Sequence, residues 1–154
     1  MMNVPLGFGL TDKILVNMVV EDDSLTPQYK TEGASGADLK ANEDCVLQPL
    51  ERKLISTGVK VSIPRGHEGQ VRARSGLSAK QGLTLVNGIG TIDSDYTGEI
   101  LVSMINLSNE PQEVHKGDRI AQLVIVPIIQ ASFEPVETLE NTVRGEGGFG
   151  HTGV

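Results

Sequence analysis

Residues 120–126 read IAQLVIV, a run typical of a buried β-strand. Apolar and β-branched residues fill it with almost no alternation, so both faces of a strand formed here must meet apolar surroundings. These surroundings are either the core of one domain or the surface of another subunit, and the run by itself leaves both open. Pro127 follows directly and marks an edge or a bulge, because proline cannot donate to a β ladder.

Similar short segments, rich in β-branched residues and bounded by proline, glycine or acidic residues, occur along most of the chain. They predict strands at residues 14–20, 46–47, 53–57, 59–63, 68–73, 83–86, 99–105 and 120–129. Only Ser75–Gln81 has the pattern of a short helix, with Ser75 as the expected N-cap. The sequence therefore predicts an all-β fold of the sandwich or barrel kind.

The apolar pattern also predicts the domain organisation. A chain of 154 residues fits one domain, and we expect that domain at residues 13–136. Residues 1–12 precede the first convincing strand and are expected to be an N-terminal extension. From Glu137 onward the pattern disappears, so residues 137–154 are expected to form a flexible Gly-rich arm with too little apolar surface to fold alone.

Charge and composition exclude several classes of protein. A net charge of −7 repels a polyanion, so no nucleic acid is expected as a partner, although a few arginines can still create a pocket for a small anion. The lone Cys45 cannot form an internal disulfide, and no secretory signal is recognisable, which predicts a cytoplasmic, intracellular protein. No apolar run approaches the ~20 residues that cross a bilayer, so no membrane association is expected.

Common catalytic motifs are absent from the sequence: no Gly-x-Ser-x-Gly, no His-Glu-x-x-His, no Cys-x-x-Cys and no P-loop. His67, His115 and His151 are widely separated, which argues against a zinc site. The Gly-rich arm cannot be a dinucleotide-binding loop, because only Val154 follows Gly153 and no helix can begin there.

Two segments remain as candidates for binding a ligand. Residues 144–153, RGEGGFGHTG, combine an arginine, flexible backbone and one aromatic ring, a set that suits a phosphorylated planar ligand but equally a disordered tail. Asn87-Gly88 predicts a hairpin that lines a pocket. The adjoining residues 91–98, TIDSDYTG, place two carboxylates and a tyrosine in one turn, where a solvated loop is the alternative.

Five segments, taken in order, carry a resemblance to a known family. They are ASGADL at 34–39, RSGLSAK at 74–80, residues 87–98, GDRIAQL at 117–123 and residues 144–153. Together they resemble the five motifs of the trimeric dUTP diphosphatase (dUTPase) family. The resemblance implies a jelly-roll-like distorted β-barrel, a homotrimer, and an active site built from three chains and closed by the Gly-rich arm.

The same resemblance implies the reaction, which is the hydrolysis of dUTP to dUMP and pyrophosphate. This reaction lowers the dUTP level and supplies dUMP for dTTP synthesis. Asp93 would be the general base that activates water for attack on the α-phosphorus. Mg²⁺ would be bound mainly by the phosphates and water. Asp38 would organise the water shell of this ion or a neighbouring cation.

The remaining residues would bind the substrate. Arg74, Ser75 and Gly76 would hold phosphates, and Gln122 would contact the α-phosphate region. Residues of the third motif would recognise the nucleoside in a tight hairpin that excludes a 5-methyl group. In that motif and just beyond it, uracil would pair with Asn87, Thr91 and the backbone around Ile92, while Tyr96 would pack on deoxyribose and Leu101 would border the pocket.

The arm would complete the site. Arg144 would bind the γ-phosphate, and Phe149 would stack on uracil. His151 and Thr152 would add donors to phosphate.

Two alternatives remain beside this interpretation. A dCTP deaminase of the same fold would release ammonia from dCTP, and the complete third and fifth motifs argue against it. A nucleotide-gated regulatory binding protein would use the order of the arm as a signal to a partner, which a pull-down with and without dUTP would test.

Overall fold

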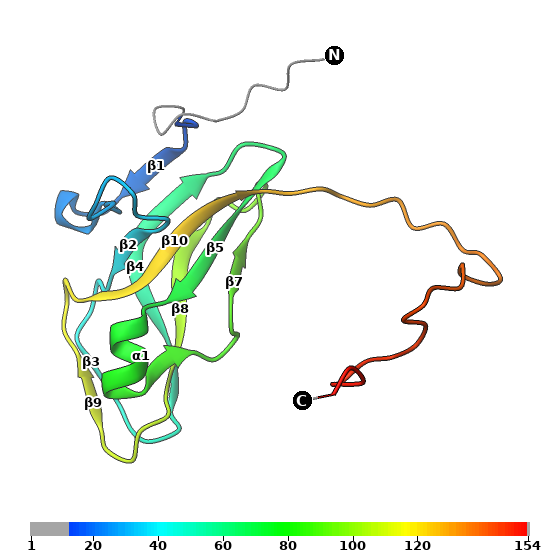
Figure 1. Ribbon diagram of the computed structural model, residues 1–154. Helices are drawn as coiled ribbons and strands as arrows, with labels where there is room; N and C mark the ends of the chain where they lie inside the picture. Colours follow the sequence, from blue (N-terminus) through cyan, green and yellow to red (C-terminus); the bar gives the residue numbers. More distant parts are fainter. Residues whose placement is uncertain (1–12, 154) are drawn as a thin grey trace.

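Ten strands, one α-helix and one 3-10 helix form the part of the chain that the computed structural model describes, residues 13–153 (Figure 1). In chain order the elements are β1 (Asn17–Val20), η1 (Asp23–Leu25), β2 (Ala37–Lys40), β3 (Cys45–Leu47), β4 (Arg52–Ser62), β5 (His67–Ala73), α1 (Ser75–Gln81), β6 (Leu83–Leu85), β7 (Gly90–Ile92), β8 (Glu99–Asn106), β9 (Gln112–Val114) and β10 (Arg119–Pro127). The predicted all-β class is confirmed. The expected extension, residues 1–12, lies outside the described residues.

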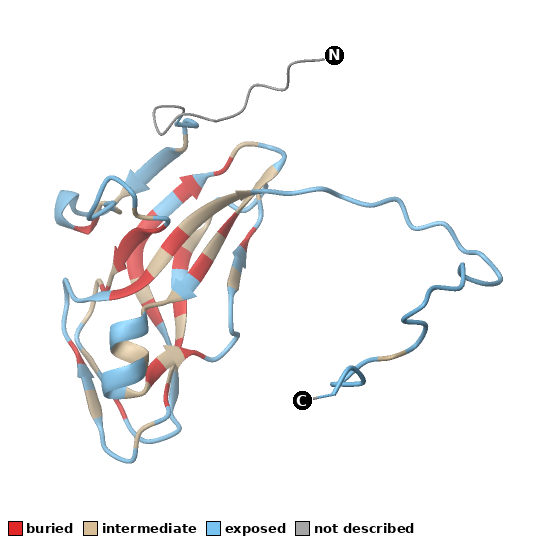
Figure 2. Cartoon of the chain, viewed as in Figure 1, coloured by how far each residue is buried: buried red, intermediate tan, exposed pale blue. Residues whose placement is uncertain are grey.

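Two antiparallel four-stranded sheets face each other across one core. Their strand orders are β1-β4-β8-β6 and β2-β10-β5-β7, and a small β3-β9 ribbon lies beside them. Strand β8 alternates strictly, with Ile100, Val102 and Met104 fully buried, as expected when one face of a strand meets the core. Buried residues of both sheets join one apolar cluster, and Figure 2 shows them along the facing strands. A jelly roll has this double-sheet arrangement.

Strand β10, which contains the run IAQLVIV, is an inner strand between β2 and β5. A register shift between Arg119 and Ala121 lets two consecutive residues, Ile120 and Ala121, be buried together, which explains part of the missing alternation. Beyond Leu123 the strand pairs with β5 alone. Pro127 therefore lies where β10 has one free edge, as predicted.

Two predictions about strand connections are wrong. The two strands expected at 53–57 and 59–63 are one strand, β4, because Gly58 sits in a register shift between Ser56 and Lys60 and does not end the strand. The hairpin expected at Asn87-Gly88 is a turn between sheets, since β6 pairs with β8 while β7 pairs with β5. The turn itself is present, and in it the Gly88 amide donates to the Leu85 carbonyl at 3.2 Å.

The predicted helix is confirmed with its bounds, but Ser75 is not its N-cap. Arg74 occupies that position with extended backbone and no side-chain cap bond, so Ser75 is already the first helical residue. Strands β2, β7 and β9 were not predicted: each has only three or four residues and includes a glycine or polar residues, so none shows an apolar β-branched run.

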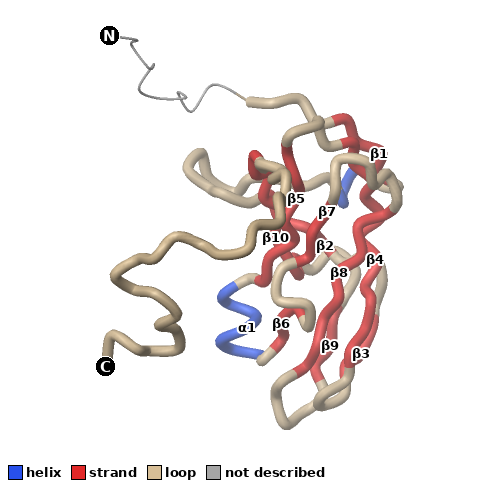
Figure 3. Tube along the Cα trace, turned by 90° about the vertical axis from the view of Figure 1, so that its right-hand side faces the viewer, coloured by secondary structure: helices blue, strands red, loops and turns tan. Residues whose placement is uncertain are grey.

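Beyond Pro127 the described chain has neither helix nor strand, and it runs away from the sheets (Figures 1 and 3). Its large apolar side chains, among them Phe133 and Val143, are exposed. Within residues 13–153, no helix has the length and apolar character needed to cross a membrane.

Candidate active site

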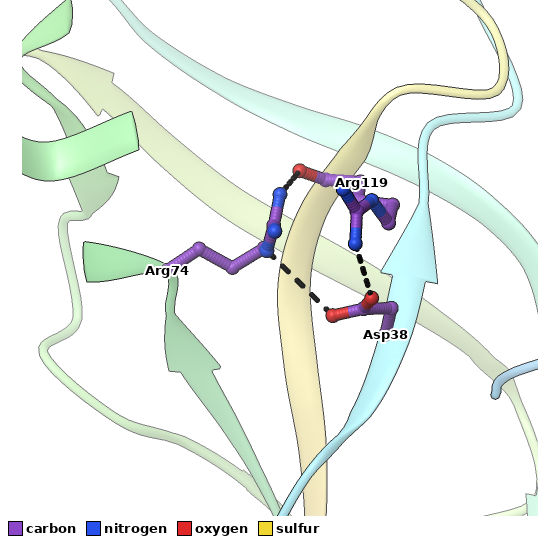
Figure 4. A network of polar contacts seen from close by, with 3 residues as sticks. All are labelled: Asp38, Arg74 and Arg119. Atoms are coloured by element: carbon purple, nitrogen blue, oxygen red, sulfur yellow. Dashed lines mark hydrogen bonds and ion pairs between the residues drawn. The ribbon is translucent and has the colours of Figure 1, made fainter. Parts of the chain in front are cut away.

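A cluster of two arginines and one aspartate lies where three elements meet (Figure 4). Asp38 of β2 is almost fully buried, and its Oδ2 accepts from Arg119 Nη1 at 3.1 Å. Arg74 approaches from the beginning of α1, with Nε 3.6 Å from Asp38 Oδ1. Arg74 Nη1 also donates to the Arg119 carbonyl at 2.8 Å. These contacts hold both guanidinium groups in place.

The cluster is a local positive site on an acidic chain, because two guanidinium groups face one carboxylate. The Arg74 side chain is 25% exposed and that of Arg119 is 42% exposed, so both can still contact a ligand. Arg74 Nε is buried and has only the 3.6 Å ion pair, too long for a hydrogen bond. The planar fork of arginine suits a phosphate.

The other predicted phosphate-binding residues lie around this cluster. Gln122 of β10 is paired in register with Asp38 of β2. Gly36 lies against Gln122, since a Cβ at position 36 would stand 2.8 Å from the Gln122 Cβ. Ser75 and Gly76 are exposed in the first turn of α1, directly after Arg74. The structure therefore brings the first, second and fourth motif segments together.

A hollow of about 190 Å³ lies at another place on the molecule. It is lined by Thr91, Ile92, Asp93, Tyr96, Glu99 and Leu101. Ile92 is buried, whereas Asp93 and Tyr96 are exposed. The tyrosine hydroxyl donates to the Glu99 carbonyl at 2.8 Å, and the Tyr96 amide donates to the Asp93 carbonyl at 3.1 Å. Five predicted site residues thus share one hollow, in a segment that is otherwise largely exposed.

Asn87 lies beside β7, near the start of the segment that lines this hollow. A Cβ at Gly90 would stand 3.4 Å from the Asn87 side-chain nitrogen. The Asn87 side chain is exposed and available to a ligand.

Within one chain the cluster and the hollow lie at opposite ends of β5. Ile92 pairs with Gly69, so Asp93 lies next to Glu68 at the beginning of the strand, whereas Arg74 follows its last residue. Arg74 is six residue steps beyond Glu68, which corresponds to about 20 Å at the strand rise of ~3.3 Å per residue. One chain therefore does not bring Asp93 to the arginine cluster.

The predicted arm residues contact neither part of the site. Arg144, Phe149, His151 and Thr152 are exposed, and the Phe149 ring is entirely so. The arm consists of successive turns, with Arg144 Nε donating to the Gly147 carbonyl at 2.8 Å.

Two residues of the site were not predicted from the sequence. Arg119 lies inside the segment GDRIAQL, but only the fold shows that it shares Asp38 with Arg74. Glu99 directly follows TIDSDYTG and lines the hollow. An acidic residue next to a candidate motif was the only available signal.

An arginine cluster and a mixed polar and apolar hollow on a small double-sheet domain define a β protein that binds small phosphorylated ligands. The chain belongs to the dUTPase family, whose family model matches residues 22–153.

Curated relatives agree with this membership. A deoxyuridine 5'-triphosphate nucleotidohydrolase of Finegoldia magna is 50% identical over 140 residues, which cover 90% of this chain and 98% of the relative. The protein of the same name from Desulfotalea psychrophila is 55% identical over 130 residues, covering 83% and 87%.

Solved structures share the fold. The dUTPase of Staphylococcus bacteriophage 80alpha with dUPNHPP has a TM-score of 0.84 and 30% identity, covering 92% of this chain and all of the other. A dUTPase of the S. aureus phage phi11, described with a structural Mg(II) ion, has a TM-score of 0.76 and 27% identity, covering 83% and 100%.

Proposed function

We propose that this chain hydrolyses dUTP to dUMP and pyrophosphate at a site to which three copies of the chain contribute. The enzyme class follows from the family and from relatives that are 50% identical over most of both chains: the chain is a dUTP nucleotidohydrolase. The residue roles and the assembly are the proposal. The reaction would limit dUTP and supply dUMP for dTTP synthesis.

The observation that carries the assembly is the separation of Asp93 from Arg74. A general base must lie within about 2.6–3.2 Å of the water that it deprotonates, directly or through one further water. Asp93 follows β7 beside Glu68, at the other end of β5 from Arg74 and about 20 Å away along that strand, so we infer that Asp93 of one copy acts on phosphates held by Arg74 of another. Repetition of such a head-to-tail contact closes a ring, and we propose a homotrimer of jelly-roll-like barrels.

The proposed reaction is an in-line attack by water on the α-phosphorus. Asp93 takes a proton from this water as the new bond between oxygen and phosphorus forms. The bond from the α-phosphorus to the bridging oxygen breaks, and pyrophosphate leaves. Arg74, with Ser75 and Gly76 beside it, would neutralise and orient the phosphates, and Gln122 would hydrogen-bond near the α-phosphate.

The hollow would bind the nucleoside. Asn87, Thr91 and the backbone of Ile92 would pair with the edge of uracil, and Leu101 would border the ring. Tyr96 would pack on deoxyribose, so a ribose hydroxyl would clash or remain without a partner, a penalty of about 1–3 kcal/mol. The clustering of these residues around one hollow supports this assignment.

The side chains that could bind a metal in the described residues fit Mg²⁺ that arrives with the substrate. Among the described residues no group of three or more histidines, cysteines or acidic residues could hold a metal ion. Both oxygens of Asp38 face guanidinium groups, which favours a role in holding Arg74 and Arg119, with at most a water-mediated contact to the ion. The ion would add charge neutralisation at the phosphates.

The arm would close the site after the nucleotide binds. Arg144 would contact the γ-phosphate and Phe149 would cover uracil, while His151 and Thr152 would add donors to phosphate. Its exposure and lack of contacts with the sheets support a segment that docks on a ligand.

Pyrophosphate release from dUTP, dCTP, dTTP and UTP, measured with Mg²⁺, tests the proposal. We expect turnover of dUTP and little turnover of the other three. Ammonia released from dCTP would instead identify a deaminase and contradict the proposed chemistry. A pull-down with and without dUTP addresses a regulatory role separately.

A further inference from the structure

Glu99 is the first residue of β8 and lies between the hollow and the pairing of β4 with β8. Its half-buried side chain lines the hollow next to Tyr96. Its Oε1 accepts from the Gly58 amide at 2.8 Å and from the Ser56 hydroxyl. Its backbone carbonyl accepts from the Tyr96 hydroxyl at 2.8 Å. One residue therefore connects β4 to the tyrosine of the hollow.

The β4 end of this connection is an irregular part of the strand. The register between β4 and β8 shifts between Ser56 and Lys60, and Gly58 there has φ of 66°. A shift of this kind leaves backbone donors without a ladder partner, and a buried donor needs one. The Glu99 carboxylate supplies it. Thr57 joins the same strands through its hydroxyl, which donates to the Ile100 carbonyl at 2.6 Å, without touching Tyr96.

At the Tyr96 end of this connection, the tyrosine side chain is partly exposed and has one hydrogen bond. The side chain is 43% exposed and lies over Gly98, where a Cβ would stand 2.5 Å from the tyrosine oxygen. Because no side chain fits between the tyrosine and Gly98, the ring lies on the backbone there, and its hydroxyl donates to the Glu99 carbonyl. The position of the ring thus depends on the position of that backbone.

We propose that Glu99 is a positioning residue for sugar recognition. Its carboxylate anchors the backbone that receives the Tyr96 hydroxyl, and it thereby determines how strongly the enzyme prefers deoxyribose over ribose. The inference rests on the proposed packing of Tyr96 on the sugar. Glu99 touches neither the attacking water nor the phosphates in this role.

The test compares Glu99→Ala and Glu99→Gln, with kcat and KM measured separately for dUTP and UTP. In Glu99→Ala the ratio of kcat/KM for dUTP to that for UTP should fall by about tenfold or more, mainly through a higher KM for dUTP. In Glu99→Gln the ratio should stay within roughly threefold of wild type, because the amide oxygen can still accept both hydrogen bonds. An unchanged ratio in a folded Glu99→Ala protein would overturn the inference.

Thr57→Val is the matched control. It removes two buried hydrogen bonds from the same strand junction, to the Ile100 carbonyl and from the Val59 amide, but not the hydrogen bond of the Tyr96 hydroxyl. It should lower Tm while leaving the dUTP to UTP ratio unchanged. If Thr57→Val altered the ratio as much as Glu99→Ala, Glu99 would be only structural, and the inference would be overturned.

Two tyrosine variants complete the design. Tyr96→Phe removes the hydrogen bond to Glu99 and should lower the ratio of kcat/KM for dUTP to that for UTP by a smaller factor than Glu99→Ala. If Glu99→Ala does not fold, an unchanged ratio in Tyr96→Phe overturns the inference.

Tyr96→Ala tests the underlying sugar contact. If it changes the ratio and Glu99→Ala does not, only the role of Glu99 fails; if Tyr96→Ala leaves the ratio unchanged, the sugar contact and this inference both fail.

Discussion

The two ends of β5 carry two different kinds of site. At the end that leads into α1, Arg74 is held by a buried aspartate and by the Arg119 carbonyl, so charged groups are fixed before any ligand arrives. At the other end, the hollow is an open surface where the Tyr96 side chain has a single hydrogen bond, to the Glu99 carbonyl. Within one chain, therefore, the residues of the proposed phosphate contacts are held by ion pairs and hydrogen bonds, whereas those of the proposed nucleoside contacts line an open hollow.

This contrast has a physical reason in charge. Guanidinium groups near a buried carboxylate need fixed partners, since an unpaired buried charge is costly. Under the proposed function, the hollow binds an uncharged base and needs no such fixed charges, so it can stay open in the free chain. The exposed arm is the segment that we propose to cover it.

Removal of the arm should have the largest effect. Truncation after Asn141 should leave Tm and the oligomeric state unchanged, because the removed residues lack contacts with the core. The value of kcat/KM for dUTP should fall by about 10³-fold or more, since bulk water then reaches the phosphates and Arg144 is lost. Melting, sizing and steady-state kinetics measure these quantities.

Phe149→Ala serves as the intermediate case for the arm. It keeps every phosphate donor and removes only the ring, so its loss of kcat/KM should lie between those of the wild-type and truncated enzymes. A truncated protein with full activity would show that the arm is only a tail.

Substitution of the proposed base should have the next largest effect. Asp93→Asn keeps the shape of the hollow and removes the proton acceptor, so kcat should fall by at least ~10²-fold. Titration calorimetry with dUTP should show nearly normal affinity. A variant that retained wild-type kcat would remove Asp93 from the mechanism.

Mixed oligomers test whether the two ends of β5 act across chains. The wild-type protein should run as a trimer at micromolar concentration. Arg74→Ala and Asp93→Asn should each have low activity, but random 1:1 trimers should regain about a quarter of the wild-type sites, because one site takes Arg74 and Asp93 from different copies. No recovery after unfolding and refolding the mixture would place both residues in one chain.

The smallest effect concerns a residue remote from both ends. Burial raises the pKa of the Cys45 thiol above its ordinary value, with Lys53 opposing the shift. A raised pKa means less thiolate at neutral pH, so iodoacetamide should react severalfold more slowly with Cys45 than with a small free thiol, and the rate should rise with pH. Cys45→Ser should leave kcat/KM unchanged.

The sequence was informative where chemistry and local pattern coincide. The helix at Ser75–Gln81 and most long strands were predicted from the spacing of apolar residues and from the proline, glycine and acidic residues that bound each segment. The segment around Asp93 was singled out by its residue types, whereas the segment around Arg74 was found only through the resemblance to the dUTPase motifs. Gly58 was misleading, because a glycine that allows a register shift inside a strand looks the same in sequence as one that ends it.

The amino-acid pattern alone therefore predicts an all-β chain, its arginines and carboxylates, and a polar arm. Which of these groups meet depends on how the strands pair. Asp38, Arg74 and Arg119 join although they are far apart in the chain, and Asp93 is kept from Arg74 by the length of β5. The physical reason is that strand pairing is non-local: register and sheet order bring together or separate residues whose distance in sequence carries no such information.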